Sequence, residues 1–379
     1  MLGHYEGNKE SLDVASVVEP APQAIDAVLT KKEANDMPKL RNRKIVMASR
    51  PVGAPKLTDF RLVEEDAPEP RDGEVLLRTL WLSLDPYMRG RMSAARSYAK
   101  SLEAGDTIVG GTVNQVVASQ RADYKVGDVV LSYAGWQDFA LSNGAGLRKL
   151  DPARAPMSTA LGVLGMPGMT AYTGLTIIGQ PKADETVVVA AATGPVGSAV
   201  GQIAKIKGCR AVGIAGGAQK CRLLVDEFGF GAAIDHRSAT FADDLAKACP
   251  KGIDIYFENV GGAVWNAVLP LLNDFARVPV CGLIAHYNDT ELPPGPDKSA
   301  FLMRNVLTKR LTLRGFIVSD FAAHAADFER DMSAWLRDGK IKYREDIVDG
   351  LDKAPEAFIG LLSGRNLGKL LVRVGNPTK

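Results

Sequence analysis

The segment Ala191–Gly197, which reads Ala-Ala-Thr-Gly-Pro-Val-Gly, has the residue types of a phosphate-binding turn. It lies between the apolar, strand-like run Thr186–Ala192 and the segment Pro195–Lys207, whose apolar residues have helical spacing. The glycines would let the backbone approach a pyrophosphate and let the helix pack on the strand, while the proline suits a first helical turn. N–H groups at that helix start bind phosphate. The predicted dinucleotide contacts are Ala192, Gly194, Pro195, Val196 and Gly197, with Ala192 in place of the usual first glycine. The alternative is a tight strand–helix turn without a ligand.

The charges that follow this turn favour NADP over NAD. An NAD site usually places an acidic residue about 20 residues further on, where it binds the ribose 2′-OH. No Asp or Glu occurs between Thr186 and Val225, and that stretch contains five Lys and Arg residues. Lys220 is therefore the predicted contact for a 2′-phosphate, with His236 and Arg237 as neighbours. The alternative for Lys220 is an ordinary solvated lysine at a helix start.

Other chemistries find little support in the sequence. The four cysteines (Cys209, Cys221, Cys249 and Cys281) lack metal-ligand spacing, and the four histidines form no H-x-x-x-H pair, so we expect no metal. No G-x-S-x-G motif of a serine hydrolase is present. A net charge of +2 argues against nucleic acid or an anionic membrane as a partner. The thinly spread cysteines and the lack of a secretory signal suggest a cytoplasmic protein.

Two kinds of element surround the candidate nucleotide site. Short β-like runs separated by turns occupy the region from Lys44 to Tyr133 and predict a small barrel-like domain. From about Met157 to Cys281, strand and helix patterns alternate, which predicts a doubly wound parallel sheet of the Rossmann type. After Ile341 the chain is β-like again, so we expect it to return to the first domain. The uncharged stretch Ala155–Pro181 is interrupted by proline and glycines, and a buried crossing between domains is favoured over a membrane span.

The expected organisation is an α/β protein with a sequence-discontinuous β-domain. Residues 1–39 are polar and without strong periodicity, and we expect a poorly ordered extension with a short helix near Ala24–Glu33. Residues 40–160 and 341–379 would form the β-barrel domain, and residues 161–340 the dinucleotide-binding domain.

Several separated motifs, in order along the chain from about Arg43 to Val374, resemble one family. The resemblance is to the zinc-independent medium-chain dehydrogenase/reductases, and more narrowly to the NADPH-dependent alkenal/one double-bond reductases of prostaglandin and curcumin reductase type. The motifs are LDPYMRGRM (Leu84–Met92), GMPGMTAYTGL (Gly165–Leu175), the turn Ala191–Gly197, YFENVGG (Tyr256–Gly262), CGLIAHYN (Cys281–Asn288), RGFIV (Arg314–Val318) and GRNLGK (Gly364–Lys369).

The resemblance implies a GroES-like domain, a Rossmann domain, NADPH as cofactor, and an active site between the two domains. It implies that hydride passes to the β-carbon of an α,β-unsaturated aldehyde or ketone, and that Tyr287 donates a hydrogen bond to the enolate oxygen. The alternative for Tyr287 is a packing tyrosine at a strand end. For Arg89, a buried structural ion pair and a substrate contact are equally open. The family often has tyrosine where this chain has His236, and serine where it has Gly217.

The further residues fall into two groups by implied contact. Substrate contacts are implied for Tyr87, Arg89 and Tyr287. Cofactor contacts are implied for Met169, Thr170, Gly217, Lys220, His236, Asn259, Val260, Cys281, Asn288, Phe316, Ile317, Val318 and Asn366.

The function predicted from the sequence is NADPH-dependent reduction of a small hydrophobic enal or enone. A quinone reductase is the alternative within the same chemistry, and a non-catalytic NADPH-binding sensor is the alternative outside it. The fold class further suggests a homodimer.

Overall fold

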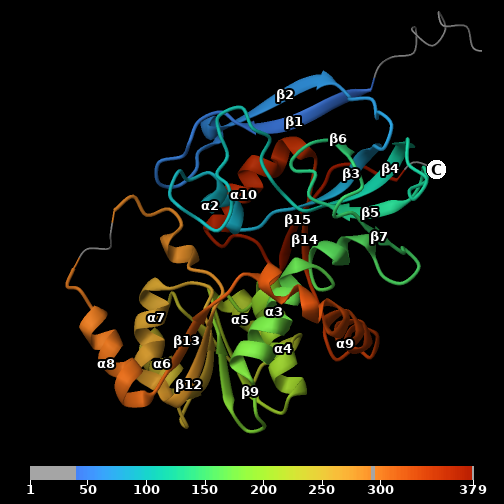
Figure 1. Ribbon diagram of the computed structural model, residues 1–379. Coiled ribbons are helices and arrows are strands. Elements are labelled where there is room, and N and C mark those ends of the chain that lie inside the picture. The colour runs from blue at the N-terminus through green and yellow to red at the C-terminus, as the bar shows by residue number, and fades with distance from the viewer. Residues whose placement is uncertain (1–39, 292–294, 378–379) are drawn as a thin grey trace, which may run out of the picture. The chain divides into compact units, whose positions relative to one another are not determined.

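The computed structural model describes residues 40–291 and 295–377 (Figure 1). The extension 1–39 and the helix expected near Ala24–Glu33 lie outside the described residues. Within the described part, two main sheets form two domains, and the segments that build each domain are far apart in the sequence.

The first domain contains a six-stranded sheet in the order β10-β9-β8-β11-β12-β13, and all neighbouring strands are parallel. Numbered within the sheet, this is the order 3-2-1-4-5-6 of a Rossmann fold. The predicted doubly wound parallel sheet is therefore confirmed. The strands are β8 (Thr186–Val189), β9 (Arg210–Ala215), β10 (Ala232–Asp235), β11 (Ile253–Phe257), β12 (Leu272–Val280) and β13 (Thr312–Gly315).

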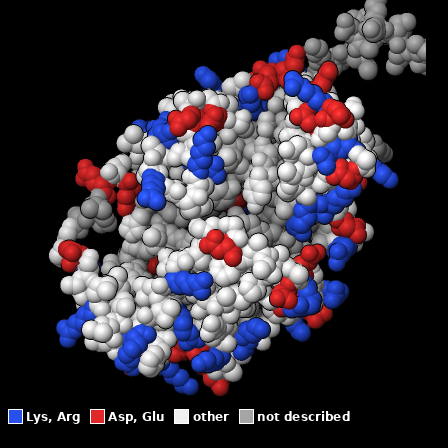
Figure 2. All heavy atoms as spheres, in the orientation of Figure 1, with Lys and Arg blue, Asp and Glu red and all other residues white. Residues whose placement is uncertain are grey.

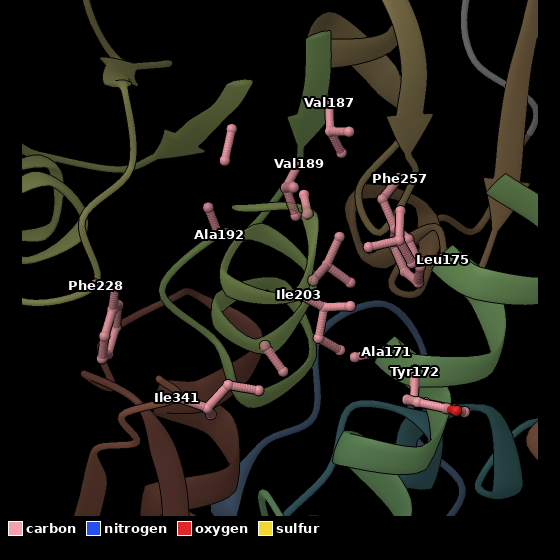
Figure 3. Packing of buried hydrophobic residues seen from close by; sticks show 14 of the residues in the cluster. Ala171, Tyr172, Leu175, Val187, Val189, Ala192, Ile203, Phe228, Phe257 and Ile341 are labelled. Carbon is pink, nitrogen blue, oxygen red and sulfur yellow. The ribbon is translucent and has the colours of Figure 1, made fainter. Parts of the chain in front are cut away.

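Strand β8 shows why this sheet forms in the interior. Val187 and Val189 belong to the hydrophobic cluster on one face, whereas Val188 and Ala190 belong to the cluster on the other. Successive strand residues point to opposite faces, so a continuous apolar run is buried on both sides. In Figure 3, Val187 and Val189 lie on the same side as Ile203 of the neighbouring helix.

Helices cover both faces of this sheet. One cluster contains residues of α3 (Met166–Thr173), α4 (Pro195–Ile206), α5 (Ala218–Asp226) and α9 (Ala325–Arg337). The cluster on the other face contains residues of α6 (Phe241–Ala248), α7 (Gly262–Val268) and α8 (Ser299–Lys309). These helices are visible around β9, β12 and β13 in Figure 1.

The second domain is a β-structure assembled from both ends of the described chain. Its seven-stranded sheet has the order β14-β15-β3-β4-β5-β7, and β6 pairs with β3. A separate antiparallel pair, β1 and β2, packs near it, with bridges from Lys44 to Gln137 and from Val46 to Thr107. The elements are β1 (Arg41–Met47), β2 (Phe60–Asp66), β3 (Val75–Ser83), α2 (Tyr87–Arg91), β4 (Thr112–Ser119), β5 (Val129–Ser132), β6 (Phe139–Ser142), β7 (Arg148–Leu150), β14 (Glu345–Asp349), α10 (Ala354–Leu362) and β15 (Lys369–Arg373).

The C-terminal strands complete this domain, as the sequence predicts. Strand β15 pairs antiparallel with β3, with Leu371 opposite Ser83. Lys369 Nζ lies 2.6 Å from Asp85 Oδ1, and both side chains are buried. A buried ion pair is costly to break because one uncompensated charge remains. The β-domain is thus discontinuous in sequence and closed by its last strand.

The uncharged stretch Ala155–Pro181 leads from one domain to the other. It contains a 3-10 helix (Met157–Leu161), α3 and a π-helical turn (Gly174–Gly179), and most of its residues are buried. At the second crossing, buried Gln202 of α4 donates to the carbonyl of Lys342 and accepts from its N–H, at 2.9 and 2.8 Å. Of the helices in the described ranges, none has the length and apolar character needed to span a bilayer.

The boundaries of some predicted elements move by a few residues for local reasons. The strand predicted over Thr186–Ala192 ends at Val189, because Ala191 adopts a positive φ of 49° and turns the chain into the glycine loop. The helix predicted from Lys220 begins at Ala218, directly after Gly217 with φ of 94°. Strands β6, β7 and β13 and helices α2, α3, α7, α8 and α9 were not predicted.

Candidate active site

The carboxyl ends of β8 and β11 lie side by side at the point where the strand order reverses. Ligands of open α/β sheets bind outside the strand ends at such a switch point. Asn259, which follows β11, donates from Nδ2 to the carbonyl of Ala190 at 2.8 Å. The predicted residue Asn259 therefore ties the two loops of the switch point together.

The glycine turn after β8 is closely packed against its own strand. A Cβ on Gly197 would lie 2.6 Å from the Ala191 oxygen and 2.7 Å from Ala192 Cα, so only glycine fits there. Gly194 is the N-cap of α4, and Pro195 is its first residue. The N–H groups of a first helical turn have no partner within the helix and are available to a phosphate. This turn fits a dinucleotide pyrophosphate.

Cationic side chains lie over the next turn of the sheet, after β9. A Cβ on Gly216 would lie 2.9 Å from both Arg237 Nε and His236 Nε2. Lys220, on α5, donates from Nζ to the Gly364 carbonyl of the β-domain at 2.8 Å. Burial, followed by the charge of Arg237, lowers the pKa of Lys220. Two cations and an imidazole gathered in this way fit an anion such as a ribose 2′-phosphate.

Asp235 fixes the backbone of this cationic cluster. Its Oδ1 accepts hydrogen bonds from the N–H groups of Gly217 and Arg237, both at 2.9 Å, and these bonds lower its pKa. The carboxylate of Asp235 accepts hydrogen bonds from the two loops that it joins. It therefore forms no ion pair with the side chains above Gly216.

A buried carboxylate shapes the loop after β11. Glu258 Oε1 accepts from the N–H groups of Val260 and Gly261 at 2.7 and 2.9 Å and from the hydroxyl of Tyr256 at 2.9 Å. Burial raises the pKa of Glu258, and the backbone hydrogen bonds act against that shift. Its own carbonyl accepts from Cys281 and Gly282, so Glu258 holds the loops after β11 and β12 in one arrangement.

Tyr287 lies at the end of the loop that follows β12. Its hydroxyl oxygen is 3.0 Å from where a Cβ on Gly282 would stand, so the phenol folds back over Gly282. Burial raises the pKa of Tyr287, with smaller contributions from Cys281 and Tyr98. Burial likewise raises the pKa of the Cys281 thiol to about 12. The phenol thus stays protonated at neutral pH and can donate a hydrogen bond.

Further phenols of the β-domain lie near Tyr287. Burial raises the pKa of Tyr87, and the neighbouring groups that act on it include Asp85, Tyr133 and Tyr98. Burial also raises the pKa of Tyr98, which is within electrostatic reach of Arg91 and Cys281. Tyr98 and Tyr133 are 65% and 68% exposed. Because Tyr98 acts on both Tyr287 and Tyr87, it is the phenol of the β-domain that reaches the loop after β12.

Arg89 of α2 crosses that boundary. It donates from Nε to Asn288 Oδ1 at 3.1 Å and from Nη2 to the Gly53 carbonyl at 2.8 Å. Arg89 is 5% exposed, and burial lowers its pKa. The guanidinium thus bonds to neutral oxygens, rather than forming the carboxylate ion pair that was one of the two expectations, and it positions Asn288 beside Tyr287.

The remaining predicted residues have varied surroundings. The ring of Phe316 packs edge-on against Phe257 and Phe321, at centroid distances of 6.2 and 5.9 Å, and is buried. Because the ring is buried, a cofactor could contact Phe316 only through its backbone, together with the backbone of Ile317 and Val318. Met169 and Thr170 are buried in α3, and the Thr170 hydroxyl donates to the Met166 carbonyl. Asn366 donates to the Gly368 carbonyl at 2.8 Å. Their cofactor roles stay predictions.

Figure 2 shows the surface hollowed between the two domains on the face in view, with mostly uncharged atoms along the hollow. Lys, Arg, Asp and Glu side chains lie around the hollow and over the outer parts of this face. The uncharged atoms along the hollow suit an apolar substrate.

The chain is similar to known reductases over most of its length. Residues 43–150 match a family described as the N-terminal domain of oxidoreductase, and residues 195–337 match one described as zinc-binding dehydrogenase. An NADPH-dependent curcumin reductase of Escherichia coli (strain K12) is 58% identical over 89% of this chain and 98% of that protein. Prostaglandin reductase 1 of Bos taurus is 42% identical over 85% of this chain and 96% of that protein.

A solved structure supports the same relationship. The crystal structure of CurA from Vibrio vulnificus in complex with NADPH has a TM-score of 0.87 and 56% identity over 88% of this chain and all of that chain. This chain belongs to the curcumin and prostaglandin reductase family of medium-chain dehydrogenase/reductases. The resemblance drawn from the sequence motifs is confirmed.

The description of the second matched family mentions zinc, but the described residues of this chain offer no matching set of zinc ligands. Among the described residues, no three His, Cys, Asp or Glu side chains lie close enough together to hold a metal ion. The four cysteines are free thiols. As a member of this family, the chain is of the zinc-independent kind.

Sequence reasoning missed several residues that this family member brings to the site. Glu258 was quoted only as part of a motif, although an acidic residue inside an otherwise apolar strand end is a signal for a buried carboxylate. Tyr98 and Tyr133 gave no signal because each lies in an irregular loop. The Gly216–His236 contact joins two strand ends that only the parallel sheet order makes adjacent.

Proposed function

We propose that this protein uses NADPH to reduce a C=C bond conjugated to an aldehyde or ketone carbonyl. The carrying observation is the phenol of Tyr287, held over Gly282 at the same sheet edge as the glycine turn and the cationic cluster. A proton-bearing phenol beside a nicotinamide site is what a developing enolate requires. The activities in the names of the related reductases agree with this chemistry.

The residues present fit NADPH along the whole sheet edge. The turn Ala191–Gly197 and the start of α4 would hold the pyrophosphate, and Lys220, His236 and Arg237 would hold the 2′-phosphate. The backbone of Phe316, Ile317 and Val318, with Asn259 and Asn288, would line the nicotinamide end. When bound, NADPH supplies a hydride to the β-carbon of the substrate.

The protein's own share of the reaction is to orient the substrate and stabilise charge on its carbonyl oxygen. Tyr287 donates a hydrogen bond to that oxygen as negative charge develops on it. Because burial raises the pKa of Tyr287, the phenol keeps its proton and acts as a donor. The α-carbon takes its proton from solvent, so no strong general base is needed. His286 is already paired with Asp289, whose Oδ2 lies 2.7 Å from Nδ1.

The first experiment follows NADPH oxidation at 340 nm with a simple enal, a simple enone and a quinone, each repeated with NADH. Turnover of the enal or enone with NADPH supports the proposal. Turnover of the quinone alone would replace it with a quinone reductase. Binding of NADPH without turnover of any acceptor would favour a sensor.

We also propose a homodimer that forms at the outer edge of the Rossmann sheet, where β13 is the last strand in the order. Helix α8 beside it exposes Phe301, Met303 and Leu307 at 51%, 63% and 77%. Exposed apolar rows of this kind mark protein contacts. Light scattering should give twice the chain mass, and a monomer at micromolar concentration would reject the proposal. The cytoplasmic location predicted from the cysteines is kept as part of the proposal.

A further inference from the structure

The three basic side chains at the turn after β9 (Lys220, His236 and Arg237) differ in one respect that matters for ligand binding. Lys220 and Arg237 carry a fixed charge near neutral pH, whereas an imidazole gains or loses its charge in that range. Partial burial, then the charge of Arg237, lowers the pKa of His236, and Lys220 adds to this effect. The free protein therefore holds His236 neutral at pH 7, beside two positive charges.

The geometry places the imidazole within this cluster rather than beside it. Nε2 of His236 and Nε of Arg237 both lie 2.9 Å from the position of a Cβ on Gly216, so both side chains lie directly above that backbone. The backbone N–H of His236 donates to the Ala215 carbonyl at 3.0 Å, which fixes the residue next to the end of β9. An incoming anion over Gly216 would meet the imidazole and the guanidinium together.

The charges that face His236 decide the sign of the effect. Arg237 and Lys220 oppose its protonation, while Asp235 favours it. Asp235 is engaged by two backbone N–H groups, and Asp346 acts on Lys220 from β14. A 2′-phosphate carries close to two negative charges at pH 7, and it would outweigh the two cations.

We propose that His236 takes up a proton when the 2′-phosphate of NADPH binds between it, Lys220 and Arg237, so that selection of NADPH over NADH is coupled to proton uptake. The inference rests on the proposed use of NADPH and adds a change of protonation to the contact already expected of His236. The proton comes from solvent and adds to the ring nitrogen that is unprotonated in the free protein. The doubly protonated ring then donates a charge-assisted hydrogen bond to a phosphate oxygen.

Calorimetric titration of the full-length protein with NADPH tests this directly. Titrations at pH 7 in HEPES and in Tris, whose ionisation enthalpies differ, give the number of protons taken up per NADPH bound. We expect about half a proton for the unmodified protein, because an adjacent anion shifts such a pKa by about 1–3. NADH, which lacks the 2′-phosphate, should give a value near zero.

The variant His236→Gln should still bind NADPH, with a slight release of protons in place of uptake. The release is expected because the 2′-phosphate, whose pKa is about 6, loses its residual proton on entering a cationic site. His324→Gln, a histidine that packs on Phe321 in another part of the domain, should keep the full uptake. Equal uptake in the unmodified protein and in His236→Gln, or no uptake in either, would overturn the proposal.

A measurement without any variant guards against a misfolded His236→Gln protein. Between pH 7 and 9 the dissociation constant for NADPH should rise by about tenfold relative to that for NADH, as His236 loses its proton. A ratio that stays constant over this range would also overturn the proposal. Because both tests measure binding, they remain decisive even if the protein reduces no enone.

Discussion

The two ends of the proposed cofactor site use different physical means. At the phosphate end, Lys220, Arg237 and the imidazole of His236 gather at the turn after β9, and the recognition they offer is mainly charge. At the reacting end, the polar groups are phenols and amides, and burial keeps the phenol of Tyr287 protonated. One sheet edge can therefore bind a highly charged cofactor and still present a weakly polar surface to its substrate.

The largest effect is expected at the phosphate end from Gly197→Ala. Its new Cβ would lie 2.6 Å from a backbone oxygen that has no room to move, so α4 must shift away from β8. We expect NADPH binding to weaken by more than about 100-fold and the melting temperature to fall. Differential scanning fluorimetry and fluorescence titration measure both.

Gly194→Ala is the matched control for that change. Its Cβ would meet only the Ala191 oxygen at 3.3 Å, and its φ of −69° suits alanine. The melting temperature should stay near that of the unmodified protein, while NADPH binding weakens because the pyrophosphate approaches this backbone. Equal loss of stability in both variants would contradict the packing argument.

At the reacting end, Tyr287→Phe should lower kcat for an enone by about 100-fold, because one preorganised donor to the enolate oxygen is lost. The dissociation constant for NADPH should not change, since the phenol does not contact the phosphates. Steady-state kinetics and cofactor titration separate the two. Tyr343→Phe, near the start of β14, is the control, and an equal loss of kcat there would count against the assignment to Tyr287.

A smaller effect is expected from the exposed aromatic residues. Tyr98→Ala should raise KM for an aryl enone about fivefold, because a ring that stacks on the substrate is removed, and leave kcat unchanged. The KM of a small aliphatic enal should change less. Val126→Ala, at an equally exposed turn of the β-domain, should alter neither constant. A fall in kcat with no change in KM would exclude a substrate-positioning role.

The smallest effect concerns Glu258 and pH. Burial raises its pKa in the folded state, so this carboxyl imposes no penalty below its unfolded pKa and destabilises the protein as the pH rises through the folded value. Glu258→Gln lacks that penalty. The melting temperature of the unmodified protein minus that of the variant should decrease by about 2 °C between pH 4 and pH 7. A difference that grows with pH would mean that the carboxylate is net stabilising.

Much of the Rossmann domain could be predicted because its signals are local. The continuous apolar run of β8 and the helical spacing of apolar residues in α4 can be seen in the sequence. The glycines and the proline of the turn between them indicate a phosphate-binding turn. The short strands β6 and β7 could not be predicted, because three or four residues carry no periodicity and their pairing with β3 and β5 decides their structure.

The site was predictable where a motif carries it and not where distant loops meet. The sequence names Lys220 from the charge pattern and Tyr287 from the resemblance, and their roles stay predictions. The approach of Tyr98 to Tyr287 and the position of His236 over Gly216 depend on which loops the two sheets bring together. Such contacts are set by tertiary packing, and no single stretch of sequence shows them.

The pairing of β15 with β3 has a consequence for biosynthesis. Strand β3 ends at Ser83, but its partner β15 begins at Lys369, so the partner leaves the ribosome only after the whole Rossmann segment between them has been synthesised. Until then the edge of β3 and the carboxylate of Asp85 have no Lys369 to meet, while the Rossmann segment between them can already fold. During synthesis the β-domain therefore exposes an unpaired edge of β3. This exposed edge is the part of the nascent chain that most needs a chaperone, because an unpaired strand can pair with other chains.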